Sequence, residues 1–286
     1  MFGLSVAATT PFTRRGEIDL ETFRQHVITL INNGINSITF FGTTGEGPSM
    51  GLDEKLKVLS YLCPKYLNPN DAIVAIICSN TADVKIEISA YNDLGISKFL
   101  LAPPYFFGNL CSLGLKEWFS DIFSTQLESN NQFILYNIPQ MTGVTIENDL
   151  ISELRQKFNS EVIYGIKDSS GDMERAKIYL ENKGLMVAIG DERLIADSMS
   201  LGASGSICGL SNIFPQKIVE MIEDRHKDTE INTLIEEILK FPVTPGVKAI
   251  LALKTKNDIW FNVRPPLIQA SKSQIAGLKQ VMKIDG

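Results

Sequence analysis

The sequence predicts a (β/α)8 barrel over residues 1–210, followed by an all-helical extension over residues 211–286. Three observations predict this fold: eight short apolar runs recur within the first 210 residues, amphipathic stretches separate them, and only helical patterns follow. Alternating strands and helices form parallel sheets, and eight such units close a barrel. The alternative is an open doubly wound sheet, but Thr9-Thr10-Pro11-Phe12 after the first run lacks a dinucleotide-binding glycine pattern.

Each predicted strand is an apolar run bounded by glycine or polar residues. In chain order the runs are 4–8, 37–41, 72–77, 98–102, 132–137, 162–167, 185–190 and 205–208. The intervening stretches repeat apolar residues every three or four positions, which is the pattern of an amphipathic helix. In the first of them, Asp19 is predicted to cap the start and Gly34 the end. The helices of the extension are predicted at 215–224, 230–241, 247–255 and 273–283.

Composition excludes several classes of partner. The net charge of -6 is spread along the chain without long blocks of one sign, so we expect neither nucleic acid nor a membrane surface as a partner. No apolar stretch approaches the roughly 20 residues that span a bilayer. The N-terminal residues lack the basic and apolar regions of a signal peptide, so we expect a cytoplasmic protein that acts on a small molecule.

The cysteines and histidines do not predict a metal site or a disulfide framework. They are Cys63, Cys78, Cys111, Cys208, His26 and His226, and none of them form a close pair. Zinc sites require closely spaced Cys and His ligands. We assign both histidines to surface helices and expect no metal.

Lys167 is the most informative residue of the chain. It ends the apolar run 162–167 and precedes the polar turn 168–172. An amine at the end of a buried strand is partly desolvated, which favours its neutral, nucleophilic form and would suit a Schiff base with a carbonyl compound. The alternative is a strand-end lysine that extends into solvent.

Further polar residues follow other predicted strands, at the barrel face where active sites form. They are Thr43, Thr44, Tyr105, Tyr136 and Gly190, which would share that face with Lys167. The segment 42–47, Gly-Thr-Thr-Gly-Glu-Gly, lacks the Lys-Ser/Thr ending of a P-loop, but its amides and hydroxyls would suit a carboxylate. Tyr136 taken alone would also fit a core tyrosine.

These residues belong to motifs that resemble the dihydrodipicolinate synthase and N-acetylneuraminate lyase superfamily, the pyruvate-type class I aldolases. The motifs are Thr10-Pro11-Phe12, Gly42-Thr43-Thr44-Gly45-Glu46, Tyr136-Asn137-Ile138-Pro139, Gly165-Ile166-Lys167-Asp168 and Gly190-Asp191. Their order and separations fit the superfamily along nearly the whole chain, and the helical tail fits as well.

The resemblance implies a role for each matching residue. Lys167 is similar to the lysine that forms the Schiff base with pyruvate, and Tyr136 to the general acid and base. Thr43 would join Tyr136 in a proton relay, while Thr44 and the backbone amides of both threonines would hold the carboxylate. Gly190 and Ile207 match positions that line the pocket. The resemblance also implies that no organic cofactor is needed and that the protein is a homotetramer.

Two departures bear on the reaction. Met141 stands where the synthase branch has a carboxylate-binding arginine, and Phe106, next to Tyr105, stands where that branch has a second tyrosine. Gly45-Glu46-Gly47-Pro48-Ser49 and Arg264-Pro265-Pro266 are instead similar to 2-keto-3-deoxy-gluconate aldolases. We therefore expect a lyase that acts on a 2-oxo-3-deoxy sugar acid or a 4-hydroxy-2-oxo acid, with Met141 and Tyr105 contacting substrate. The alternatives are 4-hydroxy-tetrahydrodipicolinate synthase, a dehydratase with the same imine, and a non-catalytic protein that binds 2-oxo acids.

Overall fold

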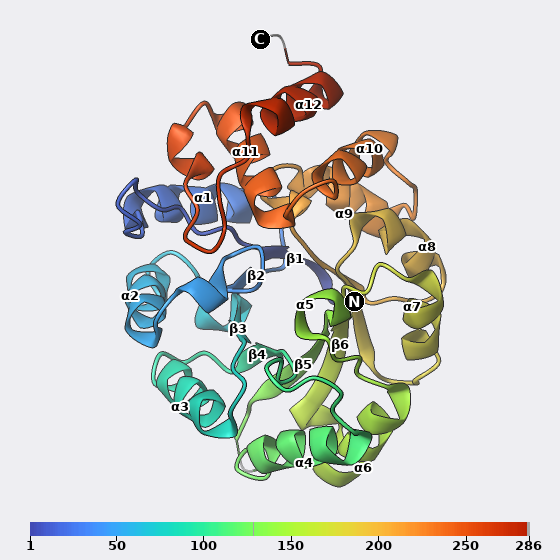
Figure 1. Cartoon of the computed structure of the whole chain (residues 1–286). Coiled ribbons are helices and arrows are strands. Elements are labelled where there is room, and N and C mark those ends of the chain that lie inside the picture. The colour runs from blue at the N-terminus through green and yellow to red at the C-terminus, as the bar shows by residue number, and fades with distance from the viewer. Residues whose placement is uncertain (128, 285–286) are drawn as a thin grey trace.

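Eight parallel strands form a closed barrel in the computed structural model, which describes residues 1–127 and 129–284 (Figure 1). Each strand pairs with its neighbours in the sequence, and β8 pairs with β1. The strands are β1 Gly3–Ala7, β2 Ser37–Phe40, β3 Ala72–Ile76, β4 Lys98–Leu101, β5 Gln132–Asn137, β6 Ile163–Asp168, β7 Met186–Ile189 and β8 Gly205–Cys208. The predicted barrel is confirmed, and every predicted strand lies within one residue of the observed one.

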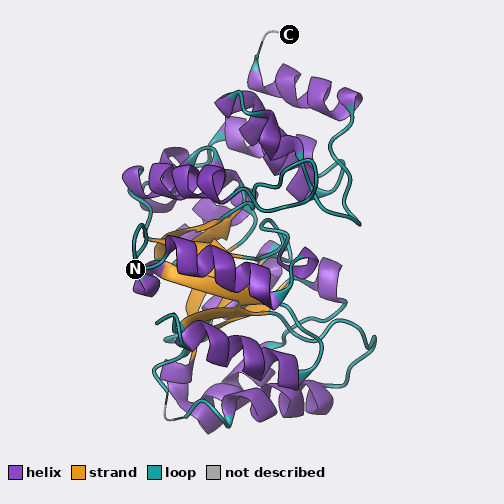
Figure 2. Cartoon of the chain, turned by 90° about the vertical axis from the view of Figure 1, so that its left-hand side faces the viewer, coloured by secondary structure: helices purple, strands orange, loops and turns teal. Residues whose placement is uncertain are grey.

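Helices form a ring around the strands (Figure 1), and in the side view they lie above, below and in front of them (Figure 2). They are α1 Leu20–Asn32, α2 Leu52–Leu62, α3 Thr81–Asn92, α4 Ser112–Phe123, α6 Asn148–Val162, α7 Met173–Leu180, α8 Ile195–Ser200 and α9 Pro215–Glu223. A short helix, α5 Pro139–Thr142, directly follows β5. The predicted caps of α1 are confirmed, because the Asp19 carboxylate accepts from the Thr22 amide and Gly34 adopts a φ of +77°.

The C-terminal helices divide into two groups. Helix α9 packs against β1 and α8 and so completes the eighth strand-helix unit. Helices α10 Thr229–Ile238, α11 Val243–Thr255 and α12 Lys272–Met282 contact one another and form a helical region beside the ring (Figure 1). The division of the chain at residue 210 remains a prediction. Within residues 1–127 and 129–284, no helix is long and apolar enough to cross a membrane.

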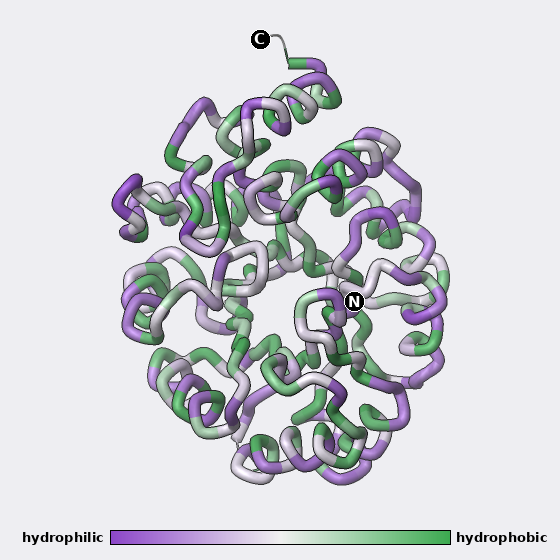
Figure 3. The backbone as a smooth tube through the Cα atoms, viewed as in Figure 1, coloured by the Kyte–Doolittle hydropathy of each residue, from purple (hydrophilic) through white to green (hydrophobic). Residues whose placement is uncertain are grey.

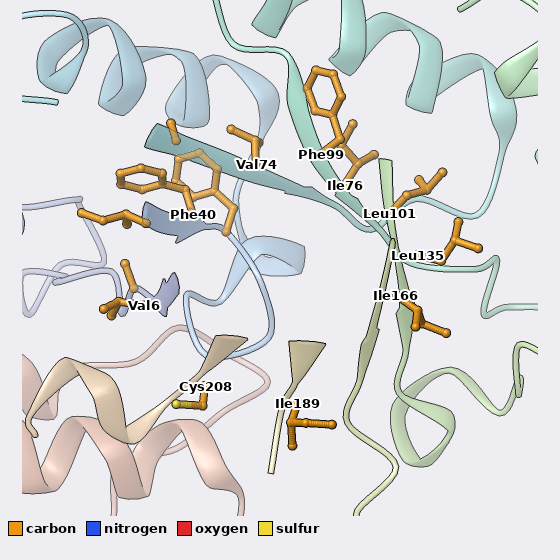
Figure 4. Close-up of a cluster of buried hydrophobic side chains, with 14 of the residues drawn as sticks. Val6, Phe40, Val74, Ile76, Phe99, Leu101, Leu135, Ile166, Ile189 and Cys208 are labelled. Carbon is orange, nitrogen blue, oxygen red and sulfur yellow. The ribbon is translucent and has the colours of Figure 1, made fainter. Parts of the chain in front are cut away.

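Side chains alternate between two cores because successive residues of a strand point to opposite faces. Val6, Val74 and Leu135 belong to the larger core between strands and helices (Figure 4). Ala75 and Tyr136 belong to the smaller core inside the barrel. The strands at the centre of the molecule are largely hydrophobic (Figure 3). Tyr136 therefore points into the barrel and not toward the helices.

The prediction that both histidines lie on surface helices is wrong. His226 is exposed but follows the end of α9. His26 lies on the buried face of α1, with its Nε2 2.9 Å from Asn212 Oδ1 and its ring against Trp260. It occupies the face of Phe23 and Leu30, so helical spacing buries it with them. Burial lowers the pKa of His26 to about 4.

Candidate active site

Lys167 and Tyr136 are direct neighbours on β6 and β5. The two residues are register partners in the parallel pair, and both side chains are buried. Residues that pair in register extend to the same face of a sheet, so the amine and the phenol enter the barrel together. Lys167 Nζ lies 4.3 Å from the centroid of the Tyr136 ring.

Lys167 differs from the other buried lysines in lacking a carboxylate partner. Lys55 pairs with Glu87 at 2.8 Å, and Lys248 pairs with Glu46 at 2.6 Å. Lys167 Nζ forms neither a salt bridge nor a hydrogen bond with any residue in the described ranges. Buried ammonium groups are almost always paired, because an isolated charge is costly to desolvate. An unpaired buried amine is therefore suited to reaction and not to structural pairing.

The loop after β2 brings two threonines to the same place from across the barrel. Thr43 Oγ1 lies 3.2 Å from the Tyr136 hydroxyl, and either oxygen could donate this hydrogen bond. The tightness of the loop requires its glycines: a Cβ at Gly47 would overlap the Phe41 carbonyl, and one at Gly45 would lie 2.7 Å from the Ala8 carbonyl oxygen.

The same loop offers unused hydrogen-bond donors. Among the described residues, the backbone amides of Thr43 and Thr44 find no acceptor, and the Thr44 hydroxyl is likewise unpaired. The absence of a side chain at Gly209 leaves room beside that hydroxyl, since an added Cβ would lie 3.5 Å from it, in van der Waals contact. Two adjacent amides and a hydroxyl form an anion-binding concavity of the kind that holds a carboxylate.

A cavity of about 120 Å³ joins these groups. Seven of the residues predicted from the sequence line it: Thr43, Thr44, Tyr136, Met141, Lys167, Gly190 and Ile207. Further lining residues were not predicted, namely Ile138, Gln140, Ser169, Asp191, Glu192, Cys208 and Gly209 on the barrel, and Ile235, Leu239, Val243 and Val247 in the helical region. Ile138 and Asp191 lie within two of the quoted motifs, and Gln140, Ser169 and Glu192 directly follow a motif, so position relative to strand ends could have identified them. No sequence pattern singles out the four apolar residues of the helical region.

Tyr105 does not line this cavity, so its contact with substrate remains a prediction. The loop after β4 extends outward, which leaves Tyr105 44% exposed and Phe106 77% exposed. Phe106 packs edge to face on Phe107, with ring centroids 5.4 Å apart. The place of Tyr105 in the sequence, just after a strand, thus predicts at which end of the barrel it lies. It does not predict the path of the longer loop that carries it.

Gly190 keeps the cavity open at the end of β7. A Cβ at this position would overlap the Ser169 hydroxyl, which follows β6. The amide of Gly190 donates to the Asp168 carbonyl at 2.7 Å and so holds the two strand ends together. Asp168 in turn accepts from Asn137 Nδ2 at 2.8 Å and from the Ser170 amide at 3.1 Å. These bonds fix the ends of β5, β6 and β7 around the lysine.

Two carboxyl groups face the cavity after β7. Asp191 is held by Arg193, whose guanidinium donates at 2.6 Å and 3.0 Å. Glu192 accepts from the Leu210 amide at 2.8 Å, and burial raises its pKa above the ordinary value. Lys167 is the only cationic residue among those that line the cavity. Within the described ranges, no three His, Cys, Asp or Glu side chains lie close enough together to hold a metal ion.

A larger cavity of about 540 Å³ lies elsewhere, between α1, α9, α10 and α12. Of its lysines, Lys254 and Lys283 are exposed, and the half-buried Lys217 is paired with Asp228 and Glu230. The smaller cavity is the stronger candidate because it combines the unpaired buried amine, the phenol and the unused amides.

Comparison with known proteins agrees with this geometry. The profile described as the Dihydrodipicolinate synthetase family matches residues 1–285. The chain is 35% identical to a dihydrodipicolinate synthase of Agrobacterium tumefaciens, with a TM-score of 0.95 over 99% of both chains. It is 29% identical to a protein of Chloroflexus aurantiacus named an uncharacterized DapA-like lyase, over 97% of this chain and 94% of that one.

A 2-keto-3-deoxygluconate aldolase from Sulfolobus shares the fold, with a TM-score of 0.85 and 23% identity over 98% of this chain and 95% of the other. The resemblance predicted from the motifs is thus confirmed over the whole length of the protein. The chain belongs to the dihydrodipicolinate synthetase family, and with that family it is a lyase of the pyruvate-dependent class I aldolase type.

Proposed function

We propose that this lyase makes or breaks the carbon–carbon bond between pyruvate and an aldehyde through a Schiff base on Lys167. The observation that carries the proposal is the buried, unpaired Lys167 amine beside the Tyr136 phenol. A protein that only bound 2-oxo acids would need neither group, and unpaired burial of a lysine is unfavourable.

The chemistry follows from these groups. The Lys167 amine attacks the keto carbon of the 2-oxo acid, and loss of water from the carbinolamine gives an iminium ion. The iminium withdraws the electron pair of the C3–C4 bond, which breaks to leave an enamine as the C4 hydroxyl loses its proton and becomes the aldehyde. Tyr136 and Thr43, which share a hydrogen bond of 3.2 Å, carry that proton. Protonation of the enamine at C3 and addition of water release pyruvate and the free amine.

The loop after β2 supplies the carboxylate site in this proposal. The amides of Thr43 and Thr44 and the Thr44 hydroxyl would donate to the carboxylate of the 2-oxo acid. Gly190 and Ile207 line the same cavity as Lys167 and would leave room for the three-carbon unit.

The rest of the cavity favours a hydroxylated aldehyde without a carboxylate. Gln140, Ser169 and Glu192 offer polar groups to sugar hydroxyls. Met141 is 58% exposed at the rim and cannot pair with a second carboxylate. We therefore propose a 2-oxo-3-deoxy sugar acid or a related 4-hydroxy-2-oxo acid as the substrate.

The second candidate is 4-hydroxy-tetrahydrodipicolinate synthase, which condenses pyruvate with aspartate semialdehyde. The name of the Agrobacterium relative favours it. Aspartate semialdehyde carries a carboxylate, and the cavity lining holds no cation apart from Lys167 to pair with it.

Two experiments test the proposal. Pyruvate and borohydride should add one reduced three-carbon unit to Lys167, detected by peptide mass spectrometry, and an unmodified Lys167 would refute the Schiff base. Pyruvate release should then be measured over a panel of 2-oxo-3-deoxy sugar acids and 4-hydroxy-2-oxo acids. Faster turnover of pyruvate with aspartate semialdehyde than of any of these compounds would establish the synthase instead.

Assembly and location complete the proposal. We propose a homotetramer in the cytoplasm, as the family resemblance implies. The exposed Phe106 and Phe107 side chains support an assembly, because paired exposed aromatic rings are typical of surfaces that bind other chains.

A further inference from the structure

A fully buried ion pair lies next to the active-site loop but outside the cavity. Glu46 follows Thr43 and Thr44 in the loop after β2, and Lys248 lies in the middle of α11. Lys248 Nζ donates to Glu46 Oε1 at 2.6 Å, and both side chains are completely inaccessible to solvent. Glu46 adopts a left-handed backbone conformation with a φ of 57°, which is uncommon for a residue other than glycine.

The pair joins three segments that are distant in the sequence. Lys248 Nζ also donates to the Thr10 carbonyl at 2.9 Å. Glu46 Oε2 accepts from the Arg264 amide at 2.9 Å. The Arg264 guanidinium then binds the Glu54 carboxylate at 2.6 Å and 2.8 Å. The loop after β2 is thus tied to the loop after β1, to α2 and to the helical region.

Two further bonds hold one peptide group of the same loop, and the first of them comes from Glu46 itself. The Thr43 carbonyl accepts from the Glu46 amide at 3.1 Å and from the Thr244 hydroxyl of α11 at 3.1 Å. That carbonyl and the Thr44 amide belong to the same planar trans peptide, so they point in opposite directions. Holding the carbonyl from one side therefore aims the Thr44 N–H the other way. This N–H is one of the unused donors of the proposed carboxylate site.

Stability alone does not explain the buried pair. Taking both charges out of water is costly, and well-packed neutral pairs are often as stable as buried ion pairs. What a neutral pair lacks is the strong directional bond that fixes Glu46, and through it the turn of the loop.

We infer that Lys248 and Glu46 are positioning residues, which hold the loop after β2 so that the Thr43 and Thr44 amides meet the carboxylate of the 2-oxo acid. The identity of the ligand in this inference rests on the proposed function. The positioning of the loop rests on the hydrogen bonds described above. The helical region thereby helps to hold the active-site loop, because α11 supplies both Lys248 and Thr244.

The test compares two buried pairs. The variant Lys248→Met/Glu46→Gln removes the charges from the active-site loop and leaves no unpaired ion. The matched control is Lys55→Met/Glu87→Gln, since Lys55 and Glu87 form the other buried pair, between α2 and α3, and bond to no atom of residues 42–47. A third variant, Thr244→Val, removes one bond to the Thr43 carbonyl and leaves the ion pair intact.

The first readout is the pyruvate concentration that gives half-maximal borohydride labelling of Lys167. We expect it to rise at least about tenfold in Lys248→Met/Glu46→Gln and a few-fold in Thr244→Val, with the maximal labelling unchanged, because a lost charge-assisted bond weakens positioning and not the amine. The control pair should stay within twofold of the wild type. Equal shifts in both double variants, or no shift in the first, would overturn the inference.

The second readout needs no ligand, so it separates this inference from the proposed function. Hydrogen exchange should accelerate at least about tenfold at the Glu46 and Gly47 amides, which are bonded within the loop, in Lys248→Met/Glu46→Gln but not in the control. If wild-type protein failed to label with pyruvate, the proposed function would fall. Unchanged exchange at these amides would contradict the role of the pair in holding the loop.

Discussion

At the scale of the residue, Lys167 should be indispensable to catalysis. Lys167→Ala removes the only amine in the cavity, so we expect kcat to fall at least about 1000-fold, a loss typical of removing a nucleophile. Pyruvate and borohydride should then leave the protein unmodified. Lys85→Ala, at an exposed pair with Asp121, is the control and should retain wild-type labelling. If Lys167→Ala kept full activity and gained the three-carbon adduct on another residue, the assignment of the Schiff base to Lys167 would be wrong.

Tyr136 and Thr43 should contribute to proton transfer during bond cleavage, in addition to any role in forming the imine. Tyr136→Phe keeps the buried ring but loses the hydroxyl, so we expect kcat to drop about 100- to 10,000-fold, the usual range for general acid–base catalysis. Thr43→Val preserves shape and removes the hydroxyl that lies 3.2 Å from the phenol, so its effect should be smaller. Steady-state kinetics of both variants measure this order. A larger effect of Thr43→Val than of Tyr136→Phe would contradict the relay.

A glycine at position 190 should be required because any side chain there would crowd the cavity that binds the 2-oxo acid. In Gly190→Ala the new methyl group would meet the Ser169 hydroxyl, so we expect KM for the 2-oxo acid to rise about tenfold as the cavity deforms. Adding Ser169→Gly removes the opposing side chain and should restore part of the loss. Kinetics of the single and double variants provide the comparison. If the double variant behaved no better than Gly190→Ala, crowding by Ser169 would not be the cause.

The sequence predicted the residues at strand ends and missed those contributed by distant segments. Lys167, Tyr136 and Gly190 could be predicted because barrel strands deliver their last residues to one face. Val243 and Val247 could not, because only the packing of α11 against the loop after β2 brings them to the cavity. The position of Tyr105 outside the cavity has the same physical reason: the loop after β4 takes a path that no short pattern encodes.

At the scale of the element, α1 is attached to the loop after β8 by a buried neutral histidine. His26 Nε2 donates to Asn212 Oδ1, and burial lowers its pKa to about 4, below its ordinary value of about 6.5. The unfolded chain therefore binds a proton near pH 6, while the folded chain does so only near pH 4. Stability contributed by His26 is present at pH 7 and is lost as the pH falls from about 6.5 to about 4.

The measurement is urea unfolding of the wild type and His26→Gln, in which the amide can still donate to Asn212. Because Asp168 and Glu192 have raised pKa values and titrate in the opposite sense, the difference between the two proteins is the informative quantity. We expect the stability advantage of the wild type to shrink by about 2 kcal/mol between pH 7 and pH 5. A difference that does not vary with pH would refute a neutral buried His26.

The start of helix α11 could not be predicted correctly from the sequence. Its C-terminal half was predicted from 247 onward, but the helix begins at Val243. Pro245 and Gly246 hid the first turn, since both residues disfavour helix interiors. Proline is tolerated in the first turn, where its missing N–H would have no acceptor. A Cβ at Gly246 would lie 2.9 Å from the Phe241 ring, so close packing explains the glycine.

At the scale of the whole molecule, periodicity predicted the barrel because each repeat of strand and helix buries its own apolar face. Association with other chains depends instead on exposed residues that do not contribute to the folding of the chain itself. Phe106 and Phe107 are such features: they are 77% and 66% exposed, and they pack on each other at the tip of the loop after β4. A second copy of the chain is the partner that we propose for them.

The corresponding prediction concerns the mass of the assembly. In a twofold interface each substitution is present twice, and burying a phenylalanine contributes roughly 1.5–3 kcal/mol, so Phe106→Ser/Phe107→Ser should remove several times that amount. Light scattering should give four chains for the wild type and fewer for the variant at micromolar concentration. Leu201→Ser, at an exposed site after α8, should leave the mass unchanged. Circular dichroism should show the same helix content in all three proteins, because neither loop contributes to the core. A variant that remained a tetramer would show that the aromatic pair lies outside the interfaces, and a monomeric wild type would refute the proposed assembly.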